Sequence, residues 1–108
     1  MRRVVVAAGR RGRTGDPPVT AGAAPNWRPR LSPAVVLRHD RVRGTDLLVM
    51  PERVVVLTGQ AGTVLGLCDG ARDVRRIIGE LGTRFPGAPV ATDVPAFLDR
   101  MRAEGWLR

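Results

Sequence analysis

Residues 47–57 read LLVMPERVVVL, and this stretch decides the fold. Two apolar runs, 47–50 and 53–57, are separated only by Pro51 and Glu52. Proline favours a turn because its ring fixes the backbone angle that the turn needs. The second run is rich in β-branched residues, which is typical of strands. The stretch therefore predicts an antiparallel hairpin with a two-residue connection.

A third short apolar run, residues 35–37, lies upstream of this hairpin. Residues 43–46 lie between the first and second runs and read RGTD, which is turn chemistry. Three short runs with tight connections are typical of an antiparallel meander. We therefore expect a sheet of three strands.

After residue 57 the apolar residues recur at i, i+3, i+4 and i+7, which is the period of an amphipathic helix. Three such stripes follow one another: Ala61, Val64, Leu65 and Cys68; Val74, Ile77, Ile78 and Leu81; and Val94, Phe97, Leu98 and Met101. We expect side-chain caps at Thr58, at Asp73, and at Thr92 or Asp93. Pro95 would then lie in the first turn of the last helix, where its missing N–H does no harm.

The predicted order of elements is βββααα over residues 31–108, which is an α+β fold in two layers. Gly105 is suited to end the last helix. We expect Trp106 and Leu107 behind it to fold back onto the core.

The chain carries 18 Arg and 10 acidic residues, a net charge of +8, but this charge is unevenly spread. Residues 1–30 hold seven Arg and one acid, with many Gly and Pro and no apolar period. We expect this part to be a disordered extension, because it cannot bury enough apolar surface. We favour a solvated tail over an arm that binds nucleic acid. Residues 31–108, with eleven Arg and nine acids, are nearly balanced.

Composition argues against catalysis and against a metal centre. The chain has one Cys (Cys68), one Ser (Ser32) and one His (His39), so no catalytic pair or multi-ligand metal set is evident. Cys68 lies on an apolar stripe and is expected to act as a small hydrophobe. The apolar residues 4–8 are too few for a secretory signal of about 7–15 residues, and no run approaches the about 20 of a membrane span. We expect a cytoplasmic protein without a cofactor.

Several short motifs occur in a combined order: Pro51-Glu52, Cys68-Asp69-Gly70, Phe85-Pro86-Gly87, Asp93-Val94 and Gly105-Trp106-Leu107. From about Leu31 to the C-terminus, the chain resembles the PqqD family of pyrroloquinoline quinone (PQQ) biosynthesis. It departs from the family at Thr58, where an Asn is usual. The resemblance implies a winged-helix-like peptide chaperone without catalysis. Such a chaperone binds the PqqA precursor peptide and presents it to the radical SAM enzyme PqqE.

The resemblance also implies where the peptide binds, namely along the strand 53–57 and beside the helix 94–101. The candidate peptide-binding residues are Arg53, Val54, Val55, Val56, Leu57, Val94, Phe97, Leu98 and Met101. An extended peptide can add to the unpaired edge of such a strand. Alternate residues of a strand face opposite sides, and the sequence does not decide which set of strand 53–57 faces the core.

Two other functions remain open on the sequence alone. One is peptide recognition in another ribosomal-peptide modification pathway. The other is a DNA-binding winged helix, which the near balance of charge in residues 31–108 disfavours. An unpaired strand edge allows either a monomer or a strand-exchanged dimer.

Overall fold

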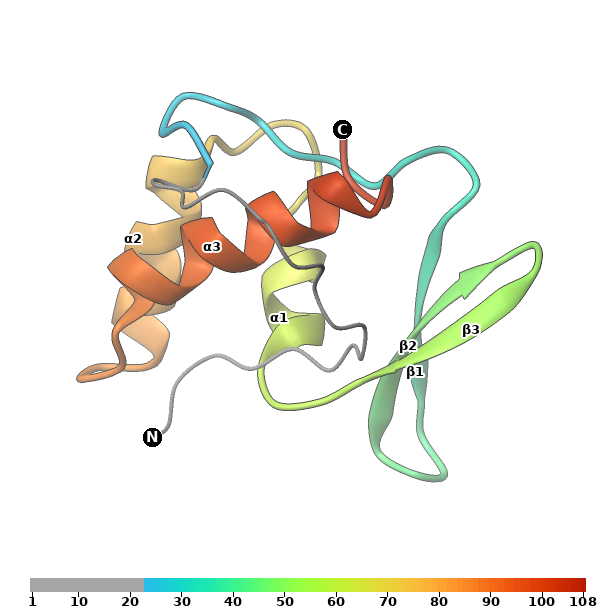
Figure 1. The fold of residues 1–108 in the computed structure, drawn as a ribbon. Helices are drawn as coiled ribbons and strands as arrows, with labels where there is room; N and C mark the ends of the chain where they lie inside the picture. The colour runs from blue at the N-terminus through green and yellow to red at the C-terminus, as the bar shows by residue number, and fades with distance from the viewer. Residues whose placement is uncertain (1–22) are drawn as a thin grey trace, which may run out of the picture.

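The computed structural model describes residues 23–108, and the elements follow the predicted order. The elements are β1 (Val36–Asp40), β2 (Thr45–Met50), β3 (Arg53–Leu57), α1 (Ala61–Gly66), α2 (Val74–Arg84) and α3 (Val90–Ala103). In Figure 1 the sheet lies on the right and α2 on the left, α1 lies between them, and α3 runs from beside α2 toward the sheet. The predicted α+β fold, three antiparallel strands followed by three helices, is confirmed.

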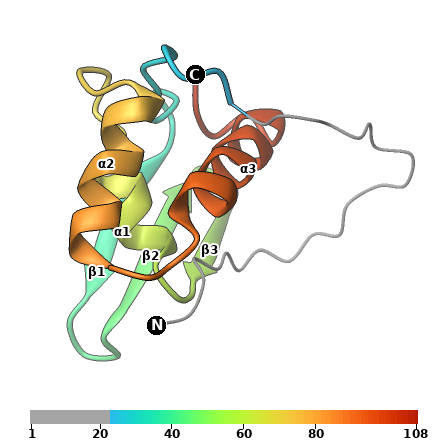
Figure 2. The same cartoon turned by 90° about the vertical axis from the view of Figure 1, so that its left-hand side faces the viewer.

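The three strands form one antiparallel sheet in the order β1-β2-β3, so β2 is central and the other two are edges. The turn at Pro51 and Glu52 joins β2 to β3 and places Met50 opposite Arg53, which confirms the predicted hairpin. Figure 2 shows the molecule turned by 90°, with the helices in front of the sheet.

The first connection differs from the prediction. We expected a turn at residues 43–46, but β2 already begins at Thr45. The turn lies earlier because Asp40 organises it: its carboxylate accepts the N–H of Val42 at 3.0 Å, and its carbonyl accepts the N–H of Gly44 at 2.7 Å. Short Asp side chains stabilise turns in this way.

The first two helices begin differently. α2 has the predicted cap, since the carboxylate of Asp73 accepts the N–H of Arg76 at 2.9 Å. The predicted cap of α1 at Thr58 is wrong, because the helix begins after Gln60 and has no side-chain cap. The backbone carbonyl of Thr58 instead accepts the N–H of Ala61 at 3.2 Å, which completes a turn before the helix.

α3 also begins earlier than predicted. Its N-cap position is Pro89, without a side-chain hydrogen bond, so Thr92 and Asp93 lie inside the helix and cap nothing. Pro95 consequently falls in the second turn, not in the first. There its missing N–H leaves the carbonyl of Ala91 without the usual helical partner.

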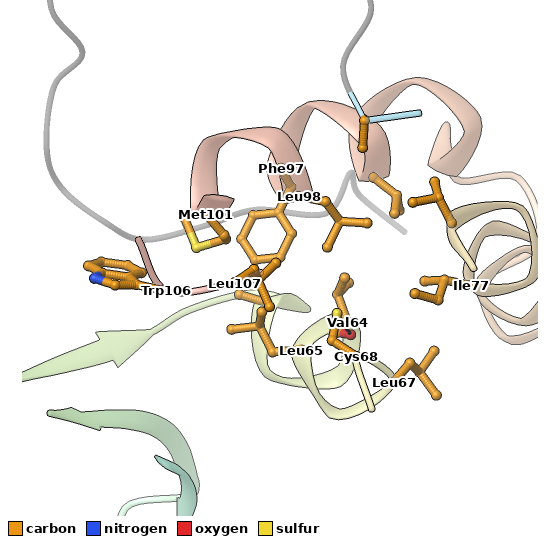
Figure 3. Close-up of a cluster of buried hydrophobic side chains, with 14 of the residues drawn as sticks. Val64, Leu65, Leu67, Cys68, Ile77, Phe97, Leu98, Met101, Trp106 and Leu107 are labelled. Carbon is orange, nitrogen blue, oxygen red and sulfur yellow. Dashed lines mark hydrogen bonds between the residues drawn. The ribbon is translucent and has the colours of Figure 1, made fainter. Parts of the chain in front are cut away.

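The core lies between the inner face of the sheet and the three helices. Leu48 at the centre of β2 and Leu57 at the end of β3 are buried there. All residues of the three predicted stripes join them, with only Ile78 partly exposed. Figure 3 shows part of this cluster, with Phe97 and Leu98 of α3 pointing toward α1. The apolar period therefore located the packing faces of the helices correctly.

Residues 23–30 pack against the helices. The N–H of Ala23 donates to Pro95 of α3 at 3.2 Å, and the carbonyl of Trp27 accepts the N–H of Val74 at 2.9 Å. Arg30 and Arg108 exchange two backbone hydrogen bonds, of 3.1 and 2.8 Å. The folded domain therefore begins upstream of the expected boundary at residue 31. Residues 1–22 of the expected extension lie outside the described residues.

Cys68 is buried, and its thiol donates to the carbonyl of Val64 at 3.4 Å. Burial, with a smaller contribution from the charge of Asp69, raises the pKa of the Cys68 thiol to about 12. The thiol therefore stays protonated at neutral pH, as suits a residue whose role is packing.

The cap of α2 can be tested by mutation. Asp73→Ala removes the acceptor for the N–H of Arg76 and should lower the free energy of unfolding by about 0.5–2 kcal/mol, measured by urea denaturation. Asp73→Asn keeps a side-chain oxygen at the same place and should retain most of the stability. Equal losses in both variants would contradict the capping role.

Cys68 should react slowly with a thiol reagent in the folded protein, because only the thiolate is nucleophilic and burial disfavours it. We expect labelling at mildly alkaline pH to be fast in denaturant and limited by unfolding in its absence. Rapid and complete labelling of the folded chain would show that the thiol is accessible.

Candidate peptide-binding site

β3 is hydrogen-bonded along one side only, and its other side has no strand partner within residues 23–108. The two residues that flank the tight turn form a hydrogen-bonded pair, and such pairs then alternate along an antiparallel ladder. Arg53, Val55 and Leu57 therefore direct their backbone groups toward β2. Val54 and Val56 direct theirs away from the sheet. The N–H and C=O groups of these two valines are available to an added strand.

The side chains of β3 divide between the two faces of the sheet. Leu57 is buried and Val55 packs against the core, so this set faces inward. Val54 is 57% exposed and Val56 is 52% exposed, so they face outward. The question that the sequence left open is thereby decided. The same two valines present both free backbone groups and uncovered apolar side chains.

Apolar residues continue across the outer face of the sheet. Val54 lies opposite Val49, which lies opposite Val36, and Val56 lies opposite Leu47. Val36 is 49% exposed. We did not predict Val36 as part of this surface. The signal for it was the apolar character of alternate positions in β2 and β3, combined with the register that places Val36 opposite Val49.

The predicted site residues of α3 have a different place. Val94, Phe97, Leu98 and Met101 are all buried in the hydrophobic core, and Figure 3 shows the last three pointing into the cluster. They present no exposed surface to a ligand. In this structure they hold α3 in place relative to the sheet.

Trp106 follows α3 in the sequence and contacts Arg53 of β3 in space. The sequence did not lead us to assign it to the site. Gly105, at φ 87°, turns the chain back. The N–H of Trp106 then donates to Met101 at 3.0 Å and that of Gly105 to Arg102 at 2.9 Å, a Schellman motif. The Arg53 guanidinium lies over the indole of Trp106, 5.5 Å from its centre. Figure 3 shows Trp106 at the margin of the core cluster.

The chemistry of this region is that of binding. Within residues 23–108 no three His, Cys, Asp or Glu side chains gather into a group that could hold a metal ion. The His39 ring nitrogen lies 2.7 Å from the Asp46 carboxylate, on the inner face of β1 and β2 rather than at the free edge of β3. What the edge offers is hydrogen-bonding groups, apolar surface and one guanidinium. None of the helices described here is long and apolar enough to cross a membrane.

Residues 47–107 match the model of the protein family described as coenzyme PQQ synthesis protein D (PqqD). PqqA binding protein 1 of Pseudomonas putida KT2440 is 39% identical over 84 residues, which cover 77% of this chain and 88% of that protein. The PqqA binding protein of Rhodopseudomonas palustris BisB5 is 39% identical over 82 residues, which cover 74% of this chain and 80% of that protein.

A solved structure has the same fold. It is the solution NMR structure of the PqqD truncation of Methylobacterium extorquens PqqCD, described as a functional and stand-alone recognition element for ribosomally synthesized and post-translationally modified peptides (RiPPs). The match has a TM-score of 0.62 at 34% identity and covers 74% of this chain and 87% of that one. Fold and sequence together assign the chain to the class of RiPP recognition elements. Within that class the chain belongs to the PqqD family, which confirms the resemblance.

The turn that places Trp106 gives a stability prediction. A Cβ at Gly105 would meet nothing within 4 Å, so Gly105→Ala adds only backbone strain and should cost about 1–2 kcal/mol of unfolding free energy. Gly79→Ala, in the interior of α2 and equally unobstructed, should raise it by about 0.5–1 kcal/mol. Thermal or urea denaturation of both variants checks this, and the same sign for both would contradict it.

Proposed function

We propose that this chain is a non-catalytic PqqA-binding protein that acts in coenzyme PQQ synthesis. Its family and the names of its relatives support this function. The structural observation that carries the proposal is the unpaired edge of β3, where Val54 and Val56 are half-exposed. The other edge, β1, presents one half-exposed valine, Val36, beside the polar side chains of Arg38 and Asp40.

In the proposed mechanism the precursor peptide adds to β3 as a fourth strand. Its main chain bonds the N–H and C=O groups of Val54 and Val56, which supplies affinity without regard to sequence. Each such hydrogen bond contributes a net amount of about 0.5–1.5 kcal/mol. Side chains of the peptide that lie next to the two valines cover their exposed surface, which favours apolar residues at those positions.

The proposal includes a second partner, a PqqE-like radical SAM enzyme in the cytoplasm. A peptide held by one strand of five residues leaves the rest of its chain free to enter an enzyme. The recognition domain then needs no cofactor of its own. Modification of PqqA by the enzyme should increase when this chain is added, and should not increase with a variant that cannot bind the peptide.

The same edge bears on the oligomeric state. A second copy that exchanged or added a strand at β3 would use the groups that the peptide needs. Peptide binding should therefore shift any dimer toward the monomer, because a ligand stabilises the state that it binds. Sedimentation with and without peptide measures this shift, and a dimer unaffected by saturating peptide would contradict it.

The edge is tested with Val54→Pro, measured by calorimetry with the PqqA peptide of the organism that makes this chain. Proline removes the free N–H of residue 54 and is tolerated on an edge strand whose N–H faces outward. We expect binding to weaken by about tenfold. Val54→Ala keeps the N–H and should lose less. Val55→Pro is unsuitable as a test, because the N–H of Val55 faces β2 and its loss would weaken the fold.

A peptide experiment tests the same proposal without changing the chain. N-methylation of one peptide residue at a time removes one N–H at a time. If the peptide adds as a strand, binding should fall at alternate residues, because only every second N–H faces β3. A folded Val54→Pro variant that binds as tightly as the parent, or an N-methyl scan without this alternation, would show that the peptide binds elsewhere.

A further inference from the structure

Arg53 differs in its surroundings from an ordinary surface arginine. Its guanidinium lies on the Trp106 indole, within the range of a cation–π contact, and Trp106 itself is only 8% exposed. Among residues 23–108 no carboxylate forms an ion pair with Arg53, although Glu52 is its neighbour in the sequence. The guanidinium of Arg53, beside the open edge, thus contacts an indole and has no acidic partner in the described part of the chain.

The cation–π contact with Trp106 prepares this guanidinium to bind a carboxylate. Contact with a buried indole restricts a side chain that otherwise has many rotamers, so less freedom is lost when a ligand binds. Within residues 23–108 no ion pair uses the guanidinium N–H groups of Arg53, so these groups remain available to a ligand. Those groups match the two oxygens of a carboxylate, in a paired geometry that adds both strength and specificity.

The position of Arg53 gives the register. It precedes Val54, whose free N–H is the first of β3 to meet an added strand, and its side chain lies on the inner face with that of Val55. A residue of the added strand that lies across from Arg53 projects to the same face. Residues across from Val54 and Val56 project to the outer face, beside two half-exposed valines.

Building on the proposed function, we propose that the Arg53–Trp106 pair selects an acidic residue of the bound peptide. The partner is then an extended segment with an Asp or Glu across from Arg53. Apolar residues lie one and three positions away from it, across from the two valines. The backbone edge provides affinity for any strand, and the stacked arginine determines where along the precursor the strand begins.

A second stacked pair in the chain provides a matched control. The Arg102 guanidinium lies over the Trp27 indole, 4.5 Å from its centre. Trp27 belongs to the segment 23–30, which is hydrogen-bonded to α2, α3 and the C-terminus and runs over the helices in Figure 1. Arg102 thus shares the chemistry of Arg53, without a position in β3.

The test measures peptide binding for the parent, Arg53→Gln, Arg53→Lys and Arg102→Gln. The probes are the PqqA peptide of the producing organism and a set in which each Asp or Glu is singly changed to its amide. We expect Arg53→Gln to weaken binding by about 10- to 100-fold, and one amide peptide to weaken binding to the parent by a similar factor. The affinity of that amide peptide should not fall further when it is measured with Arg53→Gln, because the two changes remove the same interaction.

The other two variants sharpen the result. Arg53→Lys keeps the charge but not the planar group, so its loss should be intermediate. Arg102→Gln should bind every peptide as the parent does. The inference is overturned if the loss of binding free energy caused by Arg53→Gln adds to the loss caused by every amide change. It is also overturned if Arg102→Gln weakens peptide binding as much as Arg53→Gln does.

These outcomes separate the inference from the proposed function. If Val54→Pro weakens binding while Arg53→Gln and the amide peptides do not interact, strand addition stands and acidic selection fails. If Val54→Pro is folded and binds normally, the edge itself is wrong. Should Arg53→Gln be unstable, the amide peptides compared between the parent and Arg53→Lys still decide the matter.

Discussion

The left-handed turn at Gly105 constrains both ends of the domain and the edge of its sheet. It returns the chain onto α3, so that Trp106 reaches β3 and residues 106–108 run beside residues 30–32. The hydroxyl of Ser32 donates to the carbonyl of Gly105 at 2.7 Å and holds the turn from the other side. The last helix, the N-terminal segment and the binding edge therefore share one backbone position at which any side chain is strained.

The fold could be predicted because its signals are local. The run 47–57 contains two strands and the turn between them. Each helical stripe shows the period of an amphipathic helix within eight residues. The segment 23–30 escaped prediction for the opposite reason. It is held by backbone hydrogen bonds to α2, α3 and the C-terminus, which leave no pattern of side chains in the sequence, and by the side chains of Ala23, Trp27 and Pro29, which follow no regular period. A stretch rich in Gly and Pro then resembles a tail until its partners are known.

The candidate site divides in the same way. That β3 is apolar on both faces is written in the sequence, but which face is covered depends on the register with β2 and on the helices. The stripe of α3 is ambiguous for a related reason, because an apolar period indicates a buried face and not what buries it. For Phe97 and Leu98 it is the core. Asp73 and Asp93 are equally good capping residues, yet only Asp73 has the extended backbone before a helix that capping needs.

The arginines show why net charge is a poor guide to the partner. On α2 and the loop before it, Arg72 and Arg76 share Glu80, each at 3.0 Å, and these two guanidinium groups hold the pKa of that carboxyl below its usual range. The charges of Arg72 and Arg76 are thus paired with a carboxylate of the same chain. Arg102 contacts Trp27, away from the edge of β3. Arg53 is different because it stands beside free backbone groups. In the proposed mechanism, selection of a partner therefore depends on the placement of one guanidinium along an open strand and not on the total charge.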